Sequence, residues 1–215
     1  MSSRVRVTEI FCSLQGESRS VGFPTVFVRL TGCPLRCRYC DTRYAFGGGE
    51  EIPVEEVVGR AVAMGVERVT VTGGEPLAQE GALELLHRLC DAGFAEVSLE
   101  TSGALDLAGV DRRVVKVMDL KTPGSGEADR NRYANIPLLT SRDQVKFVLC
   151  DRPDYEWAKE RMEEYDLPSR CEVLFSPASG RLSPVQLADW IVAERLPVRF
   201  QIQLHKLLWG DERGR

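Results

Sequence analysis

Short apolar segments of strand length alternate with helical segments along this chain, and this alternation restricts the fold. Strands are predicted at residues 26–30, 69–72, 97–100, 114–120, 144–150, 172–175 and 198–204. Repeated strand–helix units imply parallel strands joined by right-handed crossovers. The units are fewer than the eight of a closed barrel, so we predict an α/β fold that is a partial, open TIM-like barrel.

Helical spacing of apolar residues marks the segments between these strands. Pro53 opens one helix, whose predicted apolar stripe is Val54, Val57, Val58, Ala61 and Val62. The next helix carries the stripe Leu83, Leu86, Leu89 and Cys90, and another runs over residues 153–165. Ser183 is predicted to cap a further helix, with Pro184 at its first position and Gln186 completing a capping box.

Length and charge exclude several classes of protein. The 215 residues suit one domain, residues 1–215, with short N-terminal and C-terminal extensions. A formal net charge of −4 argues against a general nucleic-acid surface. There is no apolar run of membrane length and no signal peptide, so we expect a cytoplasmic protein without membrane contact.

Three cysteines follow the strand at residues 26–30. Cys33, Cys37 and Cys40 form a C-x3-C-x2-C cluster, and soft sulfur ligands at this spacing favour a metal ion or an iron–sulfur centre. Three ligands are one fewer than a structural site usually takes, so a metal atom is left open to a non-protein ligand. The alternative is a zinc site completed by a remote cysteine or histidine. A disulfide framework is not expected, because seven cysteines is an odd number.

The remaining cysteines have no predicted role in chemistry. Cys90, Cys150 and Cys171 lie on or beside apolar segments and are interpreted as small buried hydrophobes. Cys12 is left without an assignment.

A glycine pair follows the strand at residues 69–72. In Gly73-Gly74-Glu75-Pro76 the glycines let the backbone approach a ligand closely, and the carboxylate of Glu75 can hold an ammonium group. Taken alone, the pair could also be an ordinary turn. Thr101-Ser102 and Lys121 likewise follow predicted strands, so all of these motifs should meet at one end of the barrel.

The cysteine spacing, with Tyr39 before the last cysteine, resembles the radical S-adenosylmethionine (SAM) superfamily, and so does the Gly-Gly-Glu-Pro motif. The resemblance implies a 4Fe–4S cluster held by three cysteines, with SAM on the fourth iron. SAM is then cleaved to methionine and a 5′-deoxyadenosyl radical, so the cofactors carry the chemistry.

Three further features concern the substrate and a predicted second metal ion. Arg29 inside a strand suits either an anionic substrate group or a structural ion pair. Gln15 and Glu17 could bind the edge of a heterocycle, and Asp41-Thr42 offers hard oxygens of the kind that magnesium prefers.

With these features the chain closely resembles the 7-carboxy-7-deazaguanine synthase family. The resemblance covers nearly the whole chain, and its markers include residues 14–17, Arg29, Asp41-Thr42, residues 100–103, 119–121, 144–147 and the ending at 203–206. Ser18 departs from the glycine common in the family, and the tail continues to Arg215.

The resemblance implies a carbon–nitrogen lyase of queuosine and deazapurine biosynthesis. Its substrate would be the pterin 6-carboxy-5,6,7,8-tetrahydropterin. Hydrogen abstraction, ring contraction and loss of ammonia would give 7-carboxy-7-deazaguanine, with SAM regenerated. No catalytic residue is implied beyond the cluster and the SAM radical. A magnesium ion bound through Thr42 would steer the rearrangement.

The resemblance also implies the remaining site residues. Those expected to contact SAM are Tyr39, Cys40, Asp41, Gly74, Glu75, Ser102, Lys121, Pro123 and Ser125. Those expected to contact substrate are Leu14, Gln15, Gly16, Glu17, Arg29, Thr72 and His205. His205 lies in a predicted apolar strand, where a histidine more often has a structural role.

Partners follow from the same resemblance: an electron donor of the flavodoxin or ferredoxin type, and a second copy in a homodimer. Two other classes of function stay open. A glycyl-radical-enzyme activating enzyme shares the cysteine and glycine motifs but acts on a protein glycine. A non-catalytic zinc-stabilised module would explain the cysteines and leave the Gly73–Glu75 motif without a role.

Overall fold

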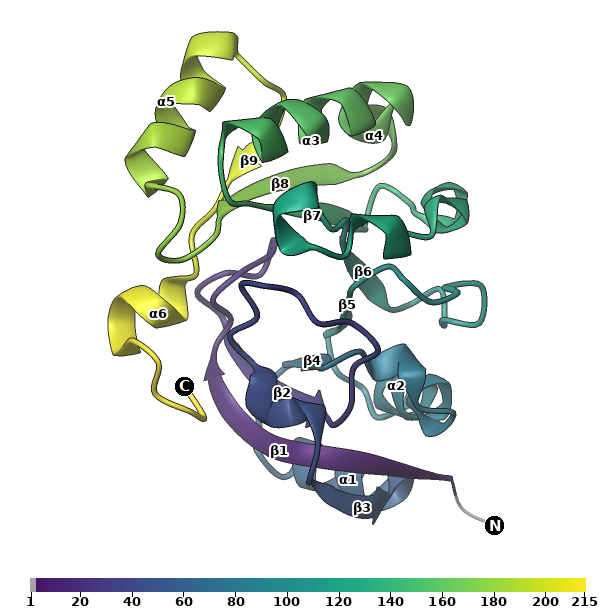
Figure 1. Cartoon of the computed structure of the whole chain (residues 1–215). Helices are drawn as coiled ribbons and strands as arrows, with labels where there is room; N and C mark the ends of the chain where they lie inside the picture. The colour runs from purple at the N-terminus through teal and green to yellow at the C-terminus, as the bar shows by residue number, and fades with distance from the viewer. Residues whose placement is uncertain (1–2) are drawn as a thin grey trace.

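The computed structural model describes residues 3–215, whose strands form one curved sheet of nine strands (Figure 1). In sheet order they are β3 (Glu50–Pro53), β1 (Arg4–Leu14), β2 (Pro24–Leu30), β4 (Arg68–Gly73), β5 (Glu96–Thr101), β6 (Val115–Asp119), β7 (Gln144–Leu149), β8 (Glu172–Pro177) and β9 (Arg199–Phe200). Neighbours from β2 to β9 are parallel, whereas β1 runs antiparallel to both β2 and β3. Because β3 and β9 are the two edges of the described sheet, the barrel is open, as predicted.

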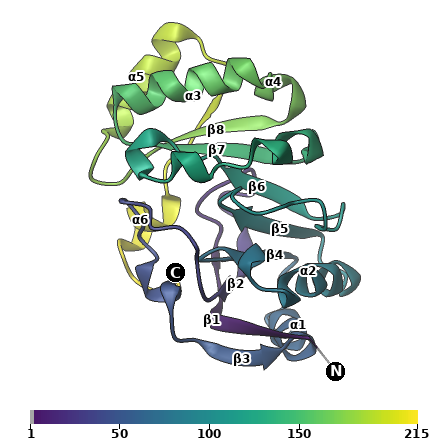
Figure 2. The same ribbon diagram turned by 45° about the vertical axis from the view of Figure 1, so that its right-hand side comes forward.

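Most helices pack beside the sheet in two groups, and the C-terminal helix lies apart from both (Figure 2). The helices are α1 (Val54–Val62), α2 (Gly81–Asp91), α3 (Arg152–Glu164), α4 (Leu167–Arg170), α5 (Pro184–Glu194) and α6 (Leu204–Trp209). One buried cluster joins α1 and α2 to β1–β5, and a second joins α3 and α5 to β6–β8. Each cluster removes apolar side chains from water, which is the main favourable term in folding.

The predicted apolar stripes are correct except at two positions. Val62 is 49% exposed because it lies about 100° around the helix from Ala61, at the edge of the buried line of α1. Leu83 is 40% exposed because the buried line of α2 runs through Ala82, Leu86 and Leu89, about 100° around the helix from it. The boundaries of these helices otherwise match the sequence pattern.

The prediction for the C-terminal segment is wrong. The strand expected over residues 198–204 is only Arg199–Phe200, and residues 204–209 form α6. After β9, the backbone N–H of Leu204 donates to the carbonyl of Gly16 at 3.0 Å, so the chain leaves the sheet edge to pack on the N-terminal segment. His205 therefore lies on a helix rather than on a strand.

Three other local features also differ from the predictions. The long strand β1 has no strong sequence signal, since its alternation of buried and exposed residues ends after Val7. β3 was not predicted, because the sequence pattern marked only its last residue, Pro53, as the start of a helix. Ser183 makes no side-chain capping hydrogen bond, so the predicted capping box is wrong, and the helix begins where Pro184 fixes the backbone angle.

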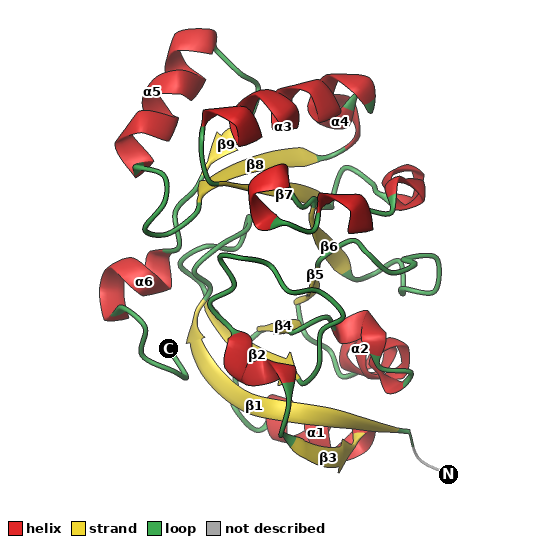
Figure 3. Cartoon of the chain, viewed as in Figure 1, coloured by secondary structure: helices red, strands yellow, loops and turns green. Residues whose placement is uncertain are grey.

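The carboxyl ends of the parallel strands converge on one side of the sheet. The cysteine segment follows β2 and is mostly loop, with one short helical turn at Arg43–Phe46 (Figure 3). The glycine pair follows β4, Ser102 follows β5, and Lys121 follows β6. Within residues 3–215, no helix combines the length and the apolar character needed to span a bilayer.

Candidate active site

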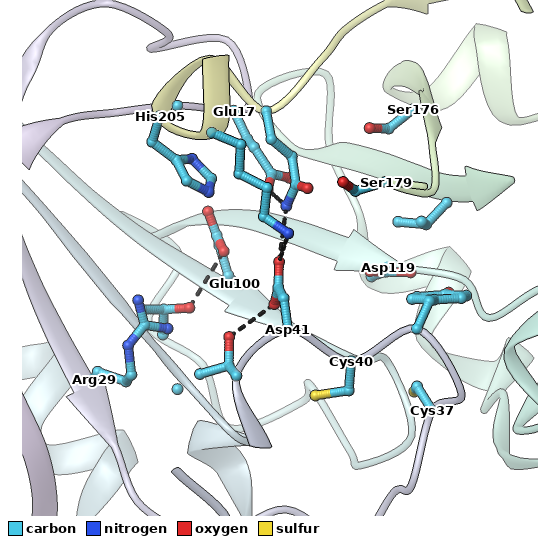
Figure 4. A pocket seen from close by; sticks show the side chains of 18 of the residues that line it. Glu17, Arg29, Cys37, Cys40, Asp41, Glu100, Asp119, Ser176, Ser179 and His205 are labelled. Carbon is cyan, nitrogen blue, oxygen red and sulfur yellow. Dashed lines mark hydrogen bonds and ion pairs between the residues drawn. The ribbon is translucent and has the colours of Figure 1, made fainter. Parts of the chain in front are cut away.

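A cavity of about 770 Å³ lies at the carboxyl ends of the parallel strands. It brings together most of the predicted site residues, namely Leu14, Gln15, Gly16, Glu17, Arg29, Cys33, Cys37, Tyr39, Cys40, Asp41, Thr42, Thr72, Gly74, Ser102, Lys121 and His205. Glu75, Pro123 and Ser125 are not part of its wall. Figure 4 shows Cys37 and Cys40 at one end of this cavity and Glu17, Glu100 and His205 at the other.

The cysteine loop is held in place by backbone hydrogen bonds and one buried anchor. The N–H of Gly32 donates to the carbonyl of Ala45 at 2.7 Å, and the N–H of Cys40 donates to Cys37 at 3.1 Å. Leu35, between the first two cysteines, is fully buried. The loop is thus folded before any ligand binds, which lowers the entropic cost of binding.

The three thiols suit a cluster better than a single ion. Cys33, Cys37 and Cys40 are all free and line the cavity. Among the described residues, no three His, Cys, Asp or Glu side chains converge closely enough to hold one metal ion. Each thiolate of an iron–sulfur cluster binds a different iron, so the ligands of a cluster need not converge on one point. The three free thiols that line the cavity therefore fit the three protein ligands predicted for a cluster.

Burial controls the charge of these thiols. It raises the pKa of Cys37 to about 11, while the nearby ammonium group of Lys121 acts to lower the pKa. Burial also raises the pKa of Cys33. Because the thiolate is the form that binds metal, the thiols must lose their protons when iron binds.

The glycine pair fits directly against the cysteine loop. A Cβ atom on Gly73, whose φ is +143°, would lie 2.1 Å from the carbonyl oxygen of Leu30. A Cβ on Gly74 would lie 2.1 Å from the carbonyl oxygen of Gly32 and 2.8 Å from the Cβ of Cys33. Both positions therefore require glycine, and the reason is close packing of two loops as well as access to a ligand.

Glu75 has an unexpected position. Its side chain is fully buried, and its carboxylate accepts hydrogen bonds from the hydroxyl of Thr101 at 2.9 Å and from the backbone N–H of Ser102 at 2.7 Å. The Ser102 hydroxyl and the N–H of Leu77 donate to it as well. Four donors leave little capacity for an additional ligand, so in this structure Glu75 joins the ends of β4 and β5.

Arg29 and Glu9 form an ion pair at the edge of the cavity. The guanidinium Nε lies 2.7 Å from a carboxylate oxygen of Glu9, which also accepts a 2.8 Å hydrogen bond from Tyr44. The Arg29 side chain is 16% exposed and lines the cavity. Arg29 can therefore serve both as a structural ion pair and as a partner for an anionic substrate group. Glu9 fixes one edge of the guanidinium, and the rest of the guanidinium still faces the cavity.

A row of alternating charges crosses the cavity floor. Lys146 Nζ lies 2.7 Å from Glu17 and 3.8 Å from Asp119, and Lys121 Nζ lies 2.9 Å from the same Asp119 carboxylate. Burial acts to raise the pKa of Glu17, but Lys146 together with the hydrogen bond from Gln203 opposes it, and the pKa is lowered. Burial acts to lower the pKa of Lys146, but the negative charges of Glu17 and Asp119 oppose it, and the pKa is raised. Both groups stay charged at neutral pH.

Glu100 is an acidic group that the sequence motifs did not single out. It lies between Thr72, which donates to it at 3.2 Å, and the Glu17–Lys146 pair. Burial is the largest cause that raises its pKa, and the charge of Glu17 adds to it. The sequence does carry a signal for Glu100, because it is the last residue of the predicted apolar strand at residues 97–100 and belongs to the 100–103 marker.

Asp41 and Thr42 sit beside the C-terminal helix α6. The Thr42 hydroxyl donates to Asp41 at 2.9 Å, and Lys206 Nζ lies 2.8 Å from the other carboxylate oxygen. Burial opposes the charge of Asp41, but these partners hold its pKa below its ordinary value. Lys206 therefore occupies one of the two oxygens that a cation would use.

His205 packs against the N-terminal segment. A Cβ on Gly16 would lie 2.1 Å from His205 Nδ1, so Gly16 is required for this contact. Burial lowers the pKa of His205, although the charge of Glu17 opposes this. The imidazole is therefore neutral at pH 7. Figure 4 shows its ring above Glu100 and beside the Glu17 group.

Two more segments of the wall were not predicted as site residues. Ser176 and Ser179, at the end of β8, line the cavity on the side of Asp119 (Figure 4). The C-terminal residues 210–215 also line it, with the Arg213 guanidinium 4.1 Å from the ring centre of Tyr44. Neither segment carries a recognisable motif.

Comparisons with known proteins agree with this geometry. The model of the Radical SAM superfamily matches residues 27–168. The chain is similar to the 7-carboxy-7-deazaguanine synthase of Chlorobaculum tepidum, with 44% identity over 98% of this chain and 97% of that protein. It is 40% identical to the 7-carboxy-7-deazaguanine synthase of Koribacter versatilis, over 97% of this chain and 98% of that protein. Its fold is similar to that of QueE from Escherichia coli, with a TM-score of 0.76, 22% identity, and coverage of 94% of this chain and 95% of that one.

Proposed function

We propose roles for the cavity residues from one premise: this chain belongs to the radical SAM superfamily and, within it, to the 7-carboxy-7-deazaguanine synthase family. We infer that it forms 7-carboxy-7-deazaguanine from 6-carboxy-5,6,7,8-tetrahydropterin. The observation that carries this inference is that three free thiols and a buried set of carboxylates and cations face one cavity. When bound, the cluster and SAM supply the electron and the radical that begin the reaction.

Residues at the cysteine end of the cavity hold the cofactors. Cys33, Cys37 and Cys40 are the ligands, and Lys121 balances their negative charge, since it lowers the pKa of Cys37. The backbone at Gly74 lets SAM approach the cluster closely, because no side chain fits there. Glu75 acts by holding Ser102 in the wall rather than by direct contact.

Residues at the other end bind the pterin. Gln15 and Glu17 face the polar edge of the heterocycle, and Glu17 is held in place by Lys146. Arg29 attracts the substrate carboxylate, because its guanidinium keeps donors free beyond the bond to Glu9. Neutral His205 and buried Glu100 close the far side. Such fixed polar groups in a water-poor site orient a substrate at little cost.

We propose that magnesium binds at Thr42 together with the substrate. Thr42 and Asp41 supply hard oxygens next to each other, which suits the ion. No cage of acidic side chains is present among the described residues, and magnesium typically takes few protein ligands and keeps several waters. Lys206 would have to leave Asp41 if that carboxylate were to take part.

The partners remain proposals as well. We expect an electron donor of the flavodoxin or ferredoxin type, a homodimer, and a place in the cytoplasm on the pathway to queuosine. Each is an expectation from the family.

The experiment is an anaerobic assay of reconstituted protein with reductant, SAM and the pterin. Product is detected by mass spectrometry, and Cys37→Ala is the control. Formation of 7-carboxy-7-deazaguanine by the wild type alone supports the proposal. Cleavage of SAM without this product would reject the substrate and favour a glycyl-radical activating role, which a peptide substrate then tests.

A further inference from the structure

Asp154 is a buried carboxylate outside the cavity wall, in the first turn of α3. Its side chain is only 1% exposed. The Oδ1 atom accepts a 2.7 Å hydrogen bond from the N–H of Gly124. The Oδ2 atom accepts bonds of 2.9 Å from the Thr122 hydroxyl and from the N–H of Cys150. All three donors are uncharged, and the carboxylate lies at a helix N-terminus, which favours a negative charge.

These bonds fasten the loop after β6 to the end of β7. Thr122 and Ser125 are fully buried, and the Ser125 hydroxyl donates to the carbonyl of Thr122 at 2.6 Å. A Cβ on Gly124 would lie 2.4 Å from Asp154 Oδ2 and 2.9 Å from the Cβ of Cys150. The loop at residues 121–126 therefore lies directly on the Asp154 carboxylate, with no space between them.

The same loop contacts the cysteine segment on its other side. The N–H of Arg38, between two cluster cysteines, donates to the carbonyl of Ser125 at 2.9 Å. The Arg38 side chain packs on Gly126, where a Cβ would lie 3.1 Å from Nε. Lys121, at the start of the loop, lines the cavity and influences Cys37. A displacement of Asp154 would thus also displace Lys121 in the cavity wall and the segment that holds the cysteines.

We propose that Asp154 is a positioning residue for SAM. Its hydrogen bonds fix the position of loop 121–126, so that Lys121 and the segment around Arg38 lie against the bound cofactor. Asp154 itself does not contact the cofactor. This inference rests on the proposed function. Residues that orient the groups contacting a bound centre typically change affinity or activity roughly ten- to hundredfold when they are replaced.

The chain offers a matched control. Asp143, just before β7 at the opposite end of the sheet, is also 1% exposed. It accepts hydrogen bonds from the N–H groups of Lys116 at 2.8 Å and Thr140 at 2.7 Å, and unlike Asp154 it also forms an ion pair, with Lys116 Nζ at 3.1 Å. Replacing either aspartate by asparagine removes a buried charge and leaves a donor unpaired, so both variants should lose stability. Only Asp154 faces the cofactor loop.

The test measures SAM affinity by equilibrium dialysis on Asp154→Asn and Asp143→Asn, each reconstituted to full iron content. The change that SAM makes in the electron paramagnetic resonance spectrum of the reduced cluster is recorded in parallel. We expect Asp154→Asn to weaken SAM binding roughly ten- to hundredfold and to alter that spectral change. Asp143→Asn should keep wild-type affinity at reduced melting temperature.

Thr122→Val and Thr122→Ser give a second, independent arm. Valine removes the hydroxyl that donates to Asp154, whereas serine retains it, so valine should weaken SAM binding and serine should restore it. Wild-type SAM affinity in Asp154→Asn or in Thr122→Val would overturn the proposal. Wild-type protein that binds SAM but forms no product from the pterin would contradict the proposed function and leave this test valid.

Discussion

Glu75→Gln tests whether the glutamate of the glycine motif supports the site or contacts SAM. The carboxylate accepts hydrogen bonds from two backbone N–H groups, Leu77 at 3.1 Å and Ser102 at 2.7 Å, one on each oxygen. The hydroxyls of Thr101 and Ser102 can rotate to adapt, but the two N–H groups cannot. An amide nitrogen in place of either oxygen leaves one N–H facing another donor.

The expected loss can be worked from these contacts. A buried N–H without a partner costs about 1–3 kcal/mol, and the remaining bonds lose the help of the charge. We expect Glu75→Gln to lower the free energy of unfolding by about 2–3 kcal/mol. For a chain of this length, the melting temperature should fall by about 4–12 °C.

The assay is thermal unfolding of the anaerobic protein, followed by circular dichroism, together with SAM affinity. Glu84→Gln on the exposed face of α2 is the control and should change stability by about 0.5 kcal/mol or less. If Glu75→Gln kept wild-type stability but lost SAM binding, the carboxylate would contact the cofactor, and its role as a support for the wall would be refuted.

Three further perturbations follow from the cavity. Gly74→Ala should lower the iron content after reconstitution, measured by a colorimetric iron assay, because the new Cβ would overlap the carbonyl of Gly32; an unchanged iron content would contradict this. Lys146→Met should cost about 3 kcal/mol of stability at pH 7, because Glu17 then stays buried without its cation. In the wild type the lowered pKa of Glu17 adds stability above about pH 4.5 that is lost as the pH falls, whereas burial alone would raise that pKa. The loss in free energy of unfolding caused by Lys146→Met, measured by urea unfolding, should therefore be smaller at pH 5 than at pH 7. A loss that does not change with pH would refute the pairing of Lys146 with Glu17. Thr42→Ala should slow turnover and blunt the response to magnesium, and an unchanged magnesium titration would reject Thr42 as a ligand.

Local patterns explain why much of the fold was predictable. The stripes of α1 and α2 and the apolar runs of β4, β5 and β7 are visible within single windows of sequence. Elements with weak local signals were predicted less well. Most of β1 has no clear alternation, and α6 lies where an apolar run suggested a strand. There, the contact between Leu204 and Gly16 outweighs local preference.

The chemistry could be predicted from the residues alone, because the cysteine spacing and the glycine pair are motifs formed by residues close together in the chain. The sequence also placed those motifs after strands, and parallel strands bring their carboxyl ends to one side. The partners of the charged groups, by contrast, depend on how the elements fold together. Lys146 meets Glu17 across 129 positions of sequence, and Glu75 is used by Thr101 and Ser102. Burial of a charge depends on the elements folded around it, so no local pattern could reveal which carboxylates face the cavity and which support its wall.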